Sequence, residues 1–313
     1  MCWYLLKRVV SSAVVLGSVS LATYALVLIT PGDPAETILR ERLNSQPSDQ
    51  EVSQFRAEHG LEEPFHVQYA NWLGNAVSGD LGQSYFHGRA VRELIAAHLP
   101  ATIELAVAAM IVALVISVPA GIVSAVYRQT SLDYISQAGA LFGVSVPNFW
   151  FGYLLIILVA LPLNAIPTSG AGSAAHLVLP AVTLGTGLAA VITRLLRASL
   201  LETLEEPYVR TARSKGLYER VVVYRHALRS ALIPVVTVIG LQFAYVLNGA
   251  VIVEAVFNRP GLGTLLVDAV FARDYPVVQG VVLVTAVLFV VTNFLVDLSY
   301  RYLDPRIDLE ASA

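Results

Sequence analysis

Residues 134–193 read YISQAGALFGVSVPNFWFGYLLIILVALPLNAIPTSGAGSAAHLVLPAVTLGTGLAAVIT and contain no Asp, Glu, Lys or Arg. One helix of that length would measure about 90 Å at about 1.5 Å per residue, whereas the hydrocarbon core of a membrane is about 30 Å thick. The stretch is therefore too long for one crossing and must fold back on itself. Pro162, Pro167, Gly170 and Gly172 mark the expected hairpin, because proline and glycine break helices.

This stretch predicts two membrane spans, at 134–161 and 177–193. Four further uncharged stretches of membrane-spanning length lie at 9–29, 105–127, 231–253 and 275–296. The first of these exceeds the roughly 7–15 apolar residues of a signal peptide, so we interpret it as a retained span. The sequence predicts an all-α polytopic membrane protein with six transmembrane helices.

The composition agrees with a membrane protein and excludes several other classes. Of the 313 residues, 56% are hydrophobic and 14% are charged, and the mean hydropathy is +0.66. Soluble domains carry about a quarter charged residues, and disordered chains are more polar still. The net charge of −3 provides no basic field for nucleic acid. The single cysteine, Cys2, excludes an intrachain disulfide framework and a thiolate metal cluster.

The basic residues predict which side of the membrane each segment occupies. With the N-terminus inside, the inner segments hold thirteen Lys and Arg, and the two short outer loops hold only Arg259 and Arg273. Since Lys and Arg accumulate on the cytoplasmic side, we expect both termini to be cytoplasmic. The expected parts are the N-terminus with the first span at 1–30, an extracytoplasmic helical insertion at 31–98, a five-helix core at 99–306 with a cytoplasmic loop at 194–229, and a cytoplasmic tail at 307–313.

The insertion at 31–98 carries ten acidic residues against five arginines. Ser48 and Glu51 have the spacing of a capping box, which predicts a helix start at this point. Gly60 fits the end of that helix, and Pro64 can begin the next one. The insertion is interpreted either as a small helical cap or as a docking surface for an extracytoplasmic partner, and the two are compatible.

The loop at 194–229 holds eight basic residues and four acids. Within it, 210–216 reads RTARSKG and is flanked by Tyr208, Val209, Leu217 and Tyr218, which predicts a short amphipathic helix ending at Gly216. Small side chains there would let a partner approach the backbone closely. A plain surface helix is the alternative interpretation.

Polar residues within the spans suggest a translocation path. Asparagine and glutamine often bond between membrane helices, so a path role is a weaker interpretation for them. Proline and glycine in spans three to five would bend or loosen these helices, as happens where broken helices line a cavity. The residues we assign to this path are Asn148, Gly187, Gln242 and Asn248.

No catalytic constellation can be assembled from the sequence. The chain has no Gly-x4-Gly-Lys-Ser/Thr loop for phosphate, no His-Glu-x-x-His zinc pair and no Gly-x-Ser-x-Gly elbow. Glu104, Glu254 and Asp297 lie at the expected span ends, where capping or anchoring is the simpler role. One alternative function is a proton-coupled secondary transporter, which would need titratable groups near the midplane, and the sequence offers none. An intramembrane hydrolase is the second alternative.

Several strings in this chain resemble one family. They are PGDP at 31–34, GDLGQS at 79–84, VPNFWFG at 146–152, YVRTARSKGL at 208–217, HALR at 226–229 with LIP at 232–234, FNRPGLG at 257–263, RDYP at 273–276 and LDPR at 303–306. In this order, across nearly the whole chain, they resemble the B-type permease subunits of bacterial peptide/nickel ABC importers, the dipeptide and oligopeptide permeases.

The resemblance implies the membrane-domain fold of type I importers, a place in the bacterial cytoplasmic membrane, and no enzymatic activity in this chain. ATP and Mg would be bound by partner ATPases. The other implied partners are a homologous second permease and an extracytoplasmic solute-binding protein. The substrate would be a dipeptide, a longer peptide, a nickel chelate, glutathione or haem.

The resemblance also assigns a role to the loop at 208–217. In the family this loop carries a Glu-Ala-Ala-x3-Gly signature that docks on the ATPase. Alignment on Gly216 places Arg210, Thr211 and Ala212 at the first three signature positions, so that Ala212 and Gly216 match it. The implied coupling residues are Arg210, Thr211, Ala212, Arg213, Ser214, Lys215, Gly216 and Leu217.

Overall fold

The computed structural model describes residues 2–29, 33–43, 45–163 and 166–303, with the side chains at 2–6, 27–29, 34, 41, 248–249 and 297–303 left out of the description. Within these residues the secondary structure is helical, and one isolated bridge joins Gln83 to Ala90. The predicted all-α class is confirmed. The predicted placement of both termini on the cytoplasmic side stays a prediction.

The chain divides into two compact units. The first unit comprises 1–102 and 260–290, and the second unit comprises 103–259 and 291–313. Helices α5 (Val91–Val126) and α14 (Tyr275–Leu303) each contribute to both units.

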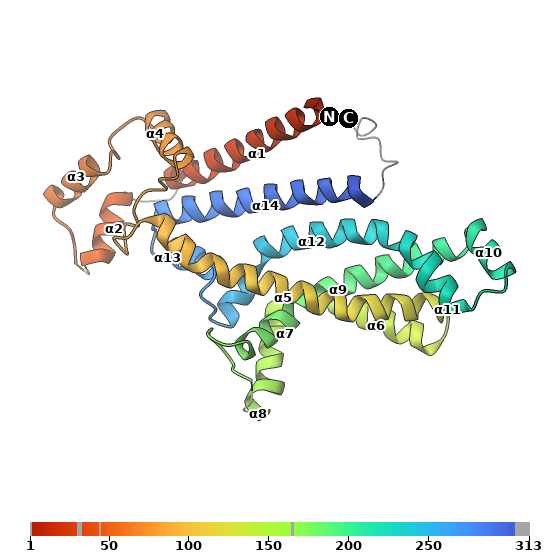
Figure 1. Ribbon diagram of the computed structural model, residues 1–313. Coiled ribbons are helices and arrows are strands. Elements are labelled where there is room, and N and C mark those ends of the chain that lie inside the picture. The colour runs from red at the N-terminus through yellow and green to blue at the C-terminus, as the bar shows by residue number, and fades with distance from the viewer. Residues whose placement is uncertain (1, 30–32, 44, 164–165, 304–313) are drawn as a thin grey trace. The chain divides into compact units, whose positions relative to one another are not determined.

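The first unit contains the segment between the first two spans together with a later segment of the chain. Its other helices are α1 (Cys2–Ile29), α2 (Pro34–Leu43), α3 (Asp49–Glu58), α4 (Phe65–Val77) and α13 (Leu262–Phe271) (Figure 1). The predicted capping box is confirmed, since the Ser48 hydroxyl accepts from the Glu51 amide at 3.3 Å and the Glu51 carboxylate accepts from the Ser48 amide at 2.7 Å. Gly60 follows α3 with a φ of +64°, and α4 begins directly after Pro64, as predicted.

The core of the first unit joins residues that are far apart in sequence. Its buried members include Leu81, Val91 and Ile95 from one part of the chain and Leu265 and Val281 from the other. A close approach of α14 to α5 supports this packing, because a Cβ at Gly280 would lie 2.6 Å from a methyl carbon of Val91. A larger residue there would require a shift of the Val91 side chain or of the backbone.

A buried carboxylate at the start of α14 holds a loop of the same unit. Asp274 accepts hydrogen bonds from the Ser84 hydroxyl and from the amides of Tyr85 (3.1 Å) and Phe86 (3.3 Å). The Ser84 hydroxyl in turn accepts from the His87 amide at 2.8 Å. We call this group, Asp274 with Ser84, Tyr85 and Phe86, the Asp274 clasp. It joins two of the strings noted in the sequence, 79–84 and 273–276.

The second unit is organised around α9 (Ala175–Leu204), which packs against α6, α7 and α12. The other elements are α6 (Ser131–Ser145), α7 (Asn148–Leu155), the π-helical segment η1 (Ile156–Ala160), α8 (Leu161–Leu163), α10 (Pro207–Ser214), α11 (Glu219–Val221), the π-helical segment η2 (Val222–Ala227) and α12 (Leu228–Val256). Helices α5 and α9 approach each other closely, since a Cβ at Gly185 would lie 2.8 Å from the Ala109 carbonyl oxygen.

Five helices are long and apolar enough to cross a membrane, and a sixth span results if α6 and the helices after it count as one. This pair is bent by 106°, and Figure 1 shows α7 turning away from α6. The span predicted at 134–161 is therefore broken, in agreement with the expectation that proline would bend or loosen it. Pro147 is the physical reason, because proline has no amide hydrogen and drives the preceding residue, Val146, out of the helical region (its ψ is 125°).

Two other predicted spans are longer than hydropathy suggested. The helix around 105–127 begins at Val91, and the helix around 177–193 continues to Leu204. Both extensions contain charged residues, which hydropathy excludes from a span although a helix can continue beyond the bilayer. Pro180 and Pro234 lie inside continuous helices.

Candidate functional site

Helix α10 is short and strongly amphipathic. Pro207 occupies its first turn, where a fixed φ and a missing amide hydrogen are tolerated. Val209 is 0% and Ala212 is 6% exposed, and both face the helices that α10 contacts, α9 and η2. The remaining coupling residues predicted from the sequence are exposed, namely Arg210, Thr211, Arg213, Ser214, Lys215, Gly216 and Leu217.

Side-chain hydrogen bonds attach α10 to the segments on both sides of it. Arg213 donates to the Glu219 carboxylate through Nε (3.1 Å) and Nη2 (2.7 Å), and through Nη1 to the Leu204 carbonyl oxygen (3.2 Å). Tyr208 donates to the Ser230 hydroxyl at 3.0 Å. Arg213 therefore connects the end of α9 to the start of α11, and α10 is held at a defined place beside them.

The chain leaves α10 through a left-handed residue. Gly216 has a φ of +76°, and its amide donates to the Arg213 carbonyl at 2.9 Å. A Cβ at this position would meet no atom within 4 Å. The backbone conformation, and not a lack of space, therefore favours glycine at this position.

The exposed face of this region is cationic. The exposed basic residues of α10 and the following segment are Arg210, Arg213, Lys215, Arg220, Arg225 and Arg229. The hydrogen bonds that Arg213 donates to the Glu219 carboxylate raise the pKa of Arg213 above its already high value, so this guanidinium stays charged. This face therefore presents positive charge to solvent.

A buried ion pair lies further along α9, and the sequence analysis did not single it out. Asp133, which is 1% exposed, accepts from Arg197 Nε (2.8 Å) and Nη2 (2.9 Å). It also accepts from the Ser124 hydroxyl (2.5 Å), the Gln129 amide (2.9 Å) and the Gln137 carboxamide (2.8 Å). We call this group the Asp133 hub. It joins the end of α5, the start of α6 and α9. On α9, Arg197 lies seven residues before Leu204, whose carbonyl accepts a hydrogen bond from Arg213.

A sequence signal for the hub was present. Asp133 is the last charged residue before the uncharged stretch 134–193, and Arg197 comes shortly after it. A hairpin that crosses the membrane twice returns its end to the side of its start. The two charges are therefore expected to meet.

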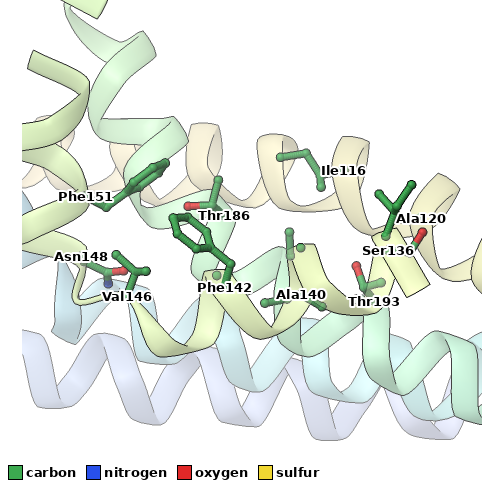
Figure 2. Close-up of a pocket in the computed structure, with 15 residues that line it drawn as sticks. Ile116, Ala120, Ser136, Ala140, Phe142, Val146, Asn148, Phe151, Thr186 and Thr193 are labelled. Carbon is green, nitrogen blue, oxygen red and sulfur yellow. The ribbon is translucent and has the colours of Figure 1, made fainter. Parts of the chain in front are cut away.

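The four path residues fall in different places within the second unit. Asn148 and Gly187 are adjacent, since a Cβ at Gly187 would lie 3.4 Å from Asn148 Oδ1. Asn148 also lines a cavity of about 230 Å³ between α5, α6, α7 and α9. Figure 2 shows Asn148 and Val146 at one end of this cavity and Ser136 and Thr193 at the other. Gln242 is half-buried on α12, and the side chain of Asn248 lies outside the described residues.

Two family models match this chain. Residues 117–309 match the inner membrane component of binding-protein-dependent transport systems, and residues 1–106 match the N-terminal model of such membrane components. The chain belongs to this family. It is the membrane permease subunit of an ABC importer, a multi-pass inner membrane protein and a transport component, not an enzyme.

Named relatives match the permease over nearly its full length. It is 39% identical to the oligopeptide transport system permease protein AppB of Bacillus subtilis (strain 168), over 98% of this chain and 100% of the relative. It is 41% identical to the glutathione transport system permease protein GsiC of Escherichia coli (strain K12), over 97% and 98% of the two chains.

Solved structures agree on the fold. A chain of the inward-facing MetNI methionine ABC transporter covers 67% of the permease with a TM-score of 0.59 and 19% identity, and 96% of that chain is matched. This neighbour supports the predicted type I importer fold.

The family implies ATPase and solute-binding partners, and nothing in the comparisons favours the proton-coupled alternative. Among the described residues, no group of three or more His, Cys, Asp or Glu could hold a metal ion.

Proposed function

We propose that the permease forms half of an inward translocation pathway for short peptides or related small solutes, and that residues 208–217 couple it to partner ATPases. The names of its relatives support the substrate class, since one is an oligopeptide and the other a glutathione permease. A homologous second permease would supply the other half, and ATP and Mg would be bound by the ATPase subunits.

The observation that carries the coupling role is the construction of α10. Only Val209 and Ala212 are buried in this helix, and the other side presents small and basic groups to solvent. Arg213 fixes the helix to α9 and α11, so a displacement of α10 would be passed to both. Another subunit could bind a helix built in this way and displace it as a rigid body.

The Asp133 hub provides a route for this displacement into the spans. Helix α9 runs from the carbonyl that binds Arg213 to Arg197, and Arg197 binds Asp133 at the start of α6. Closure of the ATPases on ATP would move α10, and α9 would carry the movement to α5 and α6. To shift an equilibrium from 1:99 to 99:1, the bound nucleotides must favour one state by about 5.5 kcal/mol.

Two further assignments complete this proposal. Residues 31–98 would form an extracytoplasmic insertion on which a solute-binding protein docks, with 1–30, 99–306 and the tail at 307–313 forming the spans and the cytoplasmic parts. The pathway would pass Asn148 and Gly187, with Gln242 and Asn248 on α12. The adjacency of Asn148 and Gly187 beside a cavity supports the first two.

Site-specific crosslinking tests the coupling role. Cys2 is the sole cysteine, so a Cys2→Ser background allows a single cysteine to be placed at the exposed Thr211. In membranes containing the complete importer, we expect Thr211→Cys to form an adduct with a nucleotide-hydrolysing subunit. The exposed Ser173, in the hairpin after α8, serves as the control position and should form none.

The outcomes separate the two parts of this proposal. If Thr211→Cys never captures an ATPase, the coupling role is wrong. If the reconstituted importer hydrolyses ATP but short peptides neither stimulate hydrolysis nor enter vesicles, the substrate class is wrong.

A further inference from the structure

The first unit contains a cleft that the proposed pathway does not use. Its volume is about 450 Å³, within the roughly 300–1,000 Å³ of small-molecule sites. The lining comes from α1, the turn at 59–63, α4, the segment 81–85 and the start of α14. The Asp274 clasp holds two of these segments together, so the cleft is formed by fixed elements.

Aromatic rings form the apolar walls of the cleft. The ring of Tyr24 lies 5.6 Å from that of Phe65 and 5.5 Å from that of Trp72, measured between centroids. On the side of the 59–63 turn, His59 and Tyr85 make an edge contact at 5.0 Å. Burial raises the pKa of Tyr85, so its phenol stays protonated. Flat rings of this kind bind apolar side chains and cations.

The carboxamide of Gln279 is a polar group on this lining with no protein partner among the described residues. Gln279 is 6% exposed, and no hydrogen bond to its carboxamide occurs within the described part of the chain. A ligand in the cleft can pair with this carboxamide. The indole nitrogen Nε1 of Trp72, by contrast, is inaccessible, so the Trp72 ring contributes an apolar wall and no donor to the cleft.

The rim of the cleft adds further selectivity. Glu63 contributes an exposed carboxylate, and Asn71 and Asn75 contribute exposed carboxamides. The segment 31–98 has an excess of acidic residues, ten against five arginines. This charge disfavours an anion and favours a ligand with a positive or neutral end.

We propose that this cleft binds a short peptide, outside the pathway formed by the second unit. The Gln279 carboxamide would pair with a peptide group, and Glu63 would receive the terminal ammonium. An apolar side chain of the peptide would lie against Tyr24 and Phe65. The choice of a peptide over another amide-bearing solute rests on the proposed function.

Titration of the full-length permease in lipid nanodiscs, without a solute-binding protein, tests this site. The probe is the tripeptide Ala-Phe-Ala, followed by isothermal titration calorimetry. Trp72→Phe retains a ring and removes an N–H that the cleft does not reach, so it should bind the tripeptide like the parent chain. Gln279→Leu removes both hydrogen-bonding atoms and should weaken binding about tenfold or more.

The controls separate loss of the ligand contact from loss of the fold. Trp150, on α7 of the second unit, is 48% exposed, and Trp150→Phe should bind the tripeptide like the parent chain. N-acetylation of the tripeptide should weaken binding to the parent chain, and by less to a Glu63→Gln variant. All variants should insert in membranes and purify as monodisperse particles.

Three results would overturn the site. One is no binding of the tripeptide at millimolar concentration, and another is equal binding by Gln279→Leu and the parent chain. The third is a lipid that co-purifies with the parent chain and is lost in Gln279→Leu, which would assign the cleft to lipid. If the complete importer transports the tripeptide in any of these cases, the proposed function stands while the site fails.

Discussion

Two buried aspartates, one in each unit, hold their surroundings by different means. Asp133 is 1% and Asp274 is 2% exposed, and a serine hydroxyl donates to each. Asp274 receives its other bonds from the neutral amides of Tyr85 and Phe86. Asp133 instead receives two bonds from the guanidinium of Arg197.

The difference shows what each group can do. A carboxylate held by the amides of one short segment fixes that segment in place. An ion pair between α6 and α9 connects two helices, and loss of one charge leaves the other buried and unpaired. We therefore expect changes near the Asp133 hub to impair coupling, and changes at the Asp274 clasp to loosen the insertion while transport is affected less.

The largest effect is expected at the end of the coupling helix. Gly216→Asp should abolish uptake with membrane insertion intact, because a bulky negative charge would block close approach of a partner. Gly216→Asn has nearly the same shape, and asparagine tolerates the φ of +76°, so it should retain more uptake. Uptake of labelled peptide by membrane vesicles measures both. Normal uptake by Gly216→Asp would refute docking at this position.

The next effect should arise at the hub. Arg197→Gln leaves the carboxylate of Asp133 buried without its ion pair, which costs about 3 kcal/mol or more. We expect uptake to fall about tenfold while ATP hydrolysis continues without stimulation by solute. Arg194→Gln, three residues earlier on the exposed side of α9, is the matched control and should change neither. If ATP hydrolysis stays coupled in Arg197→Gln, the hub is structural only.

A smaller effect on transport is expected at the clasp. Asp274→Ala removes the acceptor of three hydrogen bonds and should destabilise the loop by about 1–3 kcal/mol. Limited proteolysis should then cut within 79–91, with uptake reduced less than in Arg197→Gln. Asp268→Ala, on the exposed side of α13, should leave the loop protected. Equal losses of uptake at Asp274 and Arg197 would remove the distinction between the two aspartates.

The smallest effect should come from the exposed capping box of α3. Hydrogen bonds from Ser48 lower the pKa of Glu51 below its ordinary value of 4.5. Its ionised form therefore stabilises α3 above that pH, and the contribution is lost as the pH falls below it. At pH 7, hydrogen exchange in α3 should be faster in Glu51→Gln than in the parent chain, and at pH 4 this difference should be smaller. Glu62→Gln lies outside the helix and should show no such pH dependence.

Much of the architecture followed from local sequence. The lack of charge in 134–193, the capping box at Ser48 and Glu51, and the helix end at Gly216 each depend on residues close in the chain, and all agree with the described structure. A bend in the span that contains α6 was expected, but its size of 106° did not follow from the sequence. A proline can continue within a helix, as Pro234 does, or separate two helices, as Pro147 does, and neighbouring packing decides which.

The candidate site likewise contains parts that the sequence predicted and parts that only the structure revealed. The amphipathic helix at 207–214 and its glycine were predictable, because helical periodicity and backbone conformation are local properties. The partner of Arg213 is also near in sequence, six residues away at Glu219.

Hydropathy and local motifs alone determined that this chain crosses the membrane several times through helices and has a basic amphipathic segment around 207–217. Only the tertiary structure decided that Ser84 binds Asp274, 190 residues away, that Asp133 binds Arg197, and that Trp72 and Gln279 line one cleft. The reason is physical. Burial of a span depends on its own residues, whereas a buried polar contact depends on which distant segment arrives beside it.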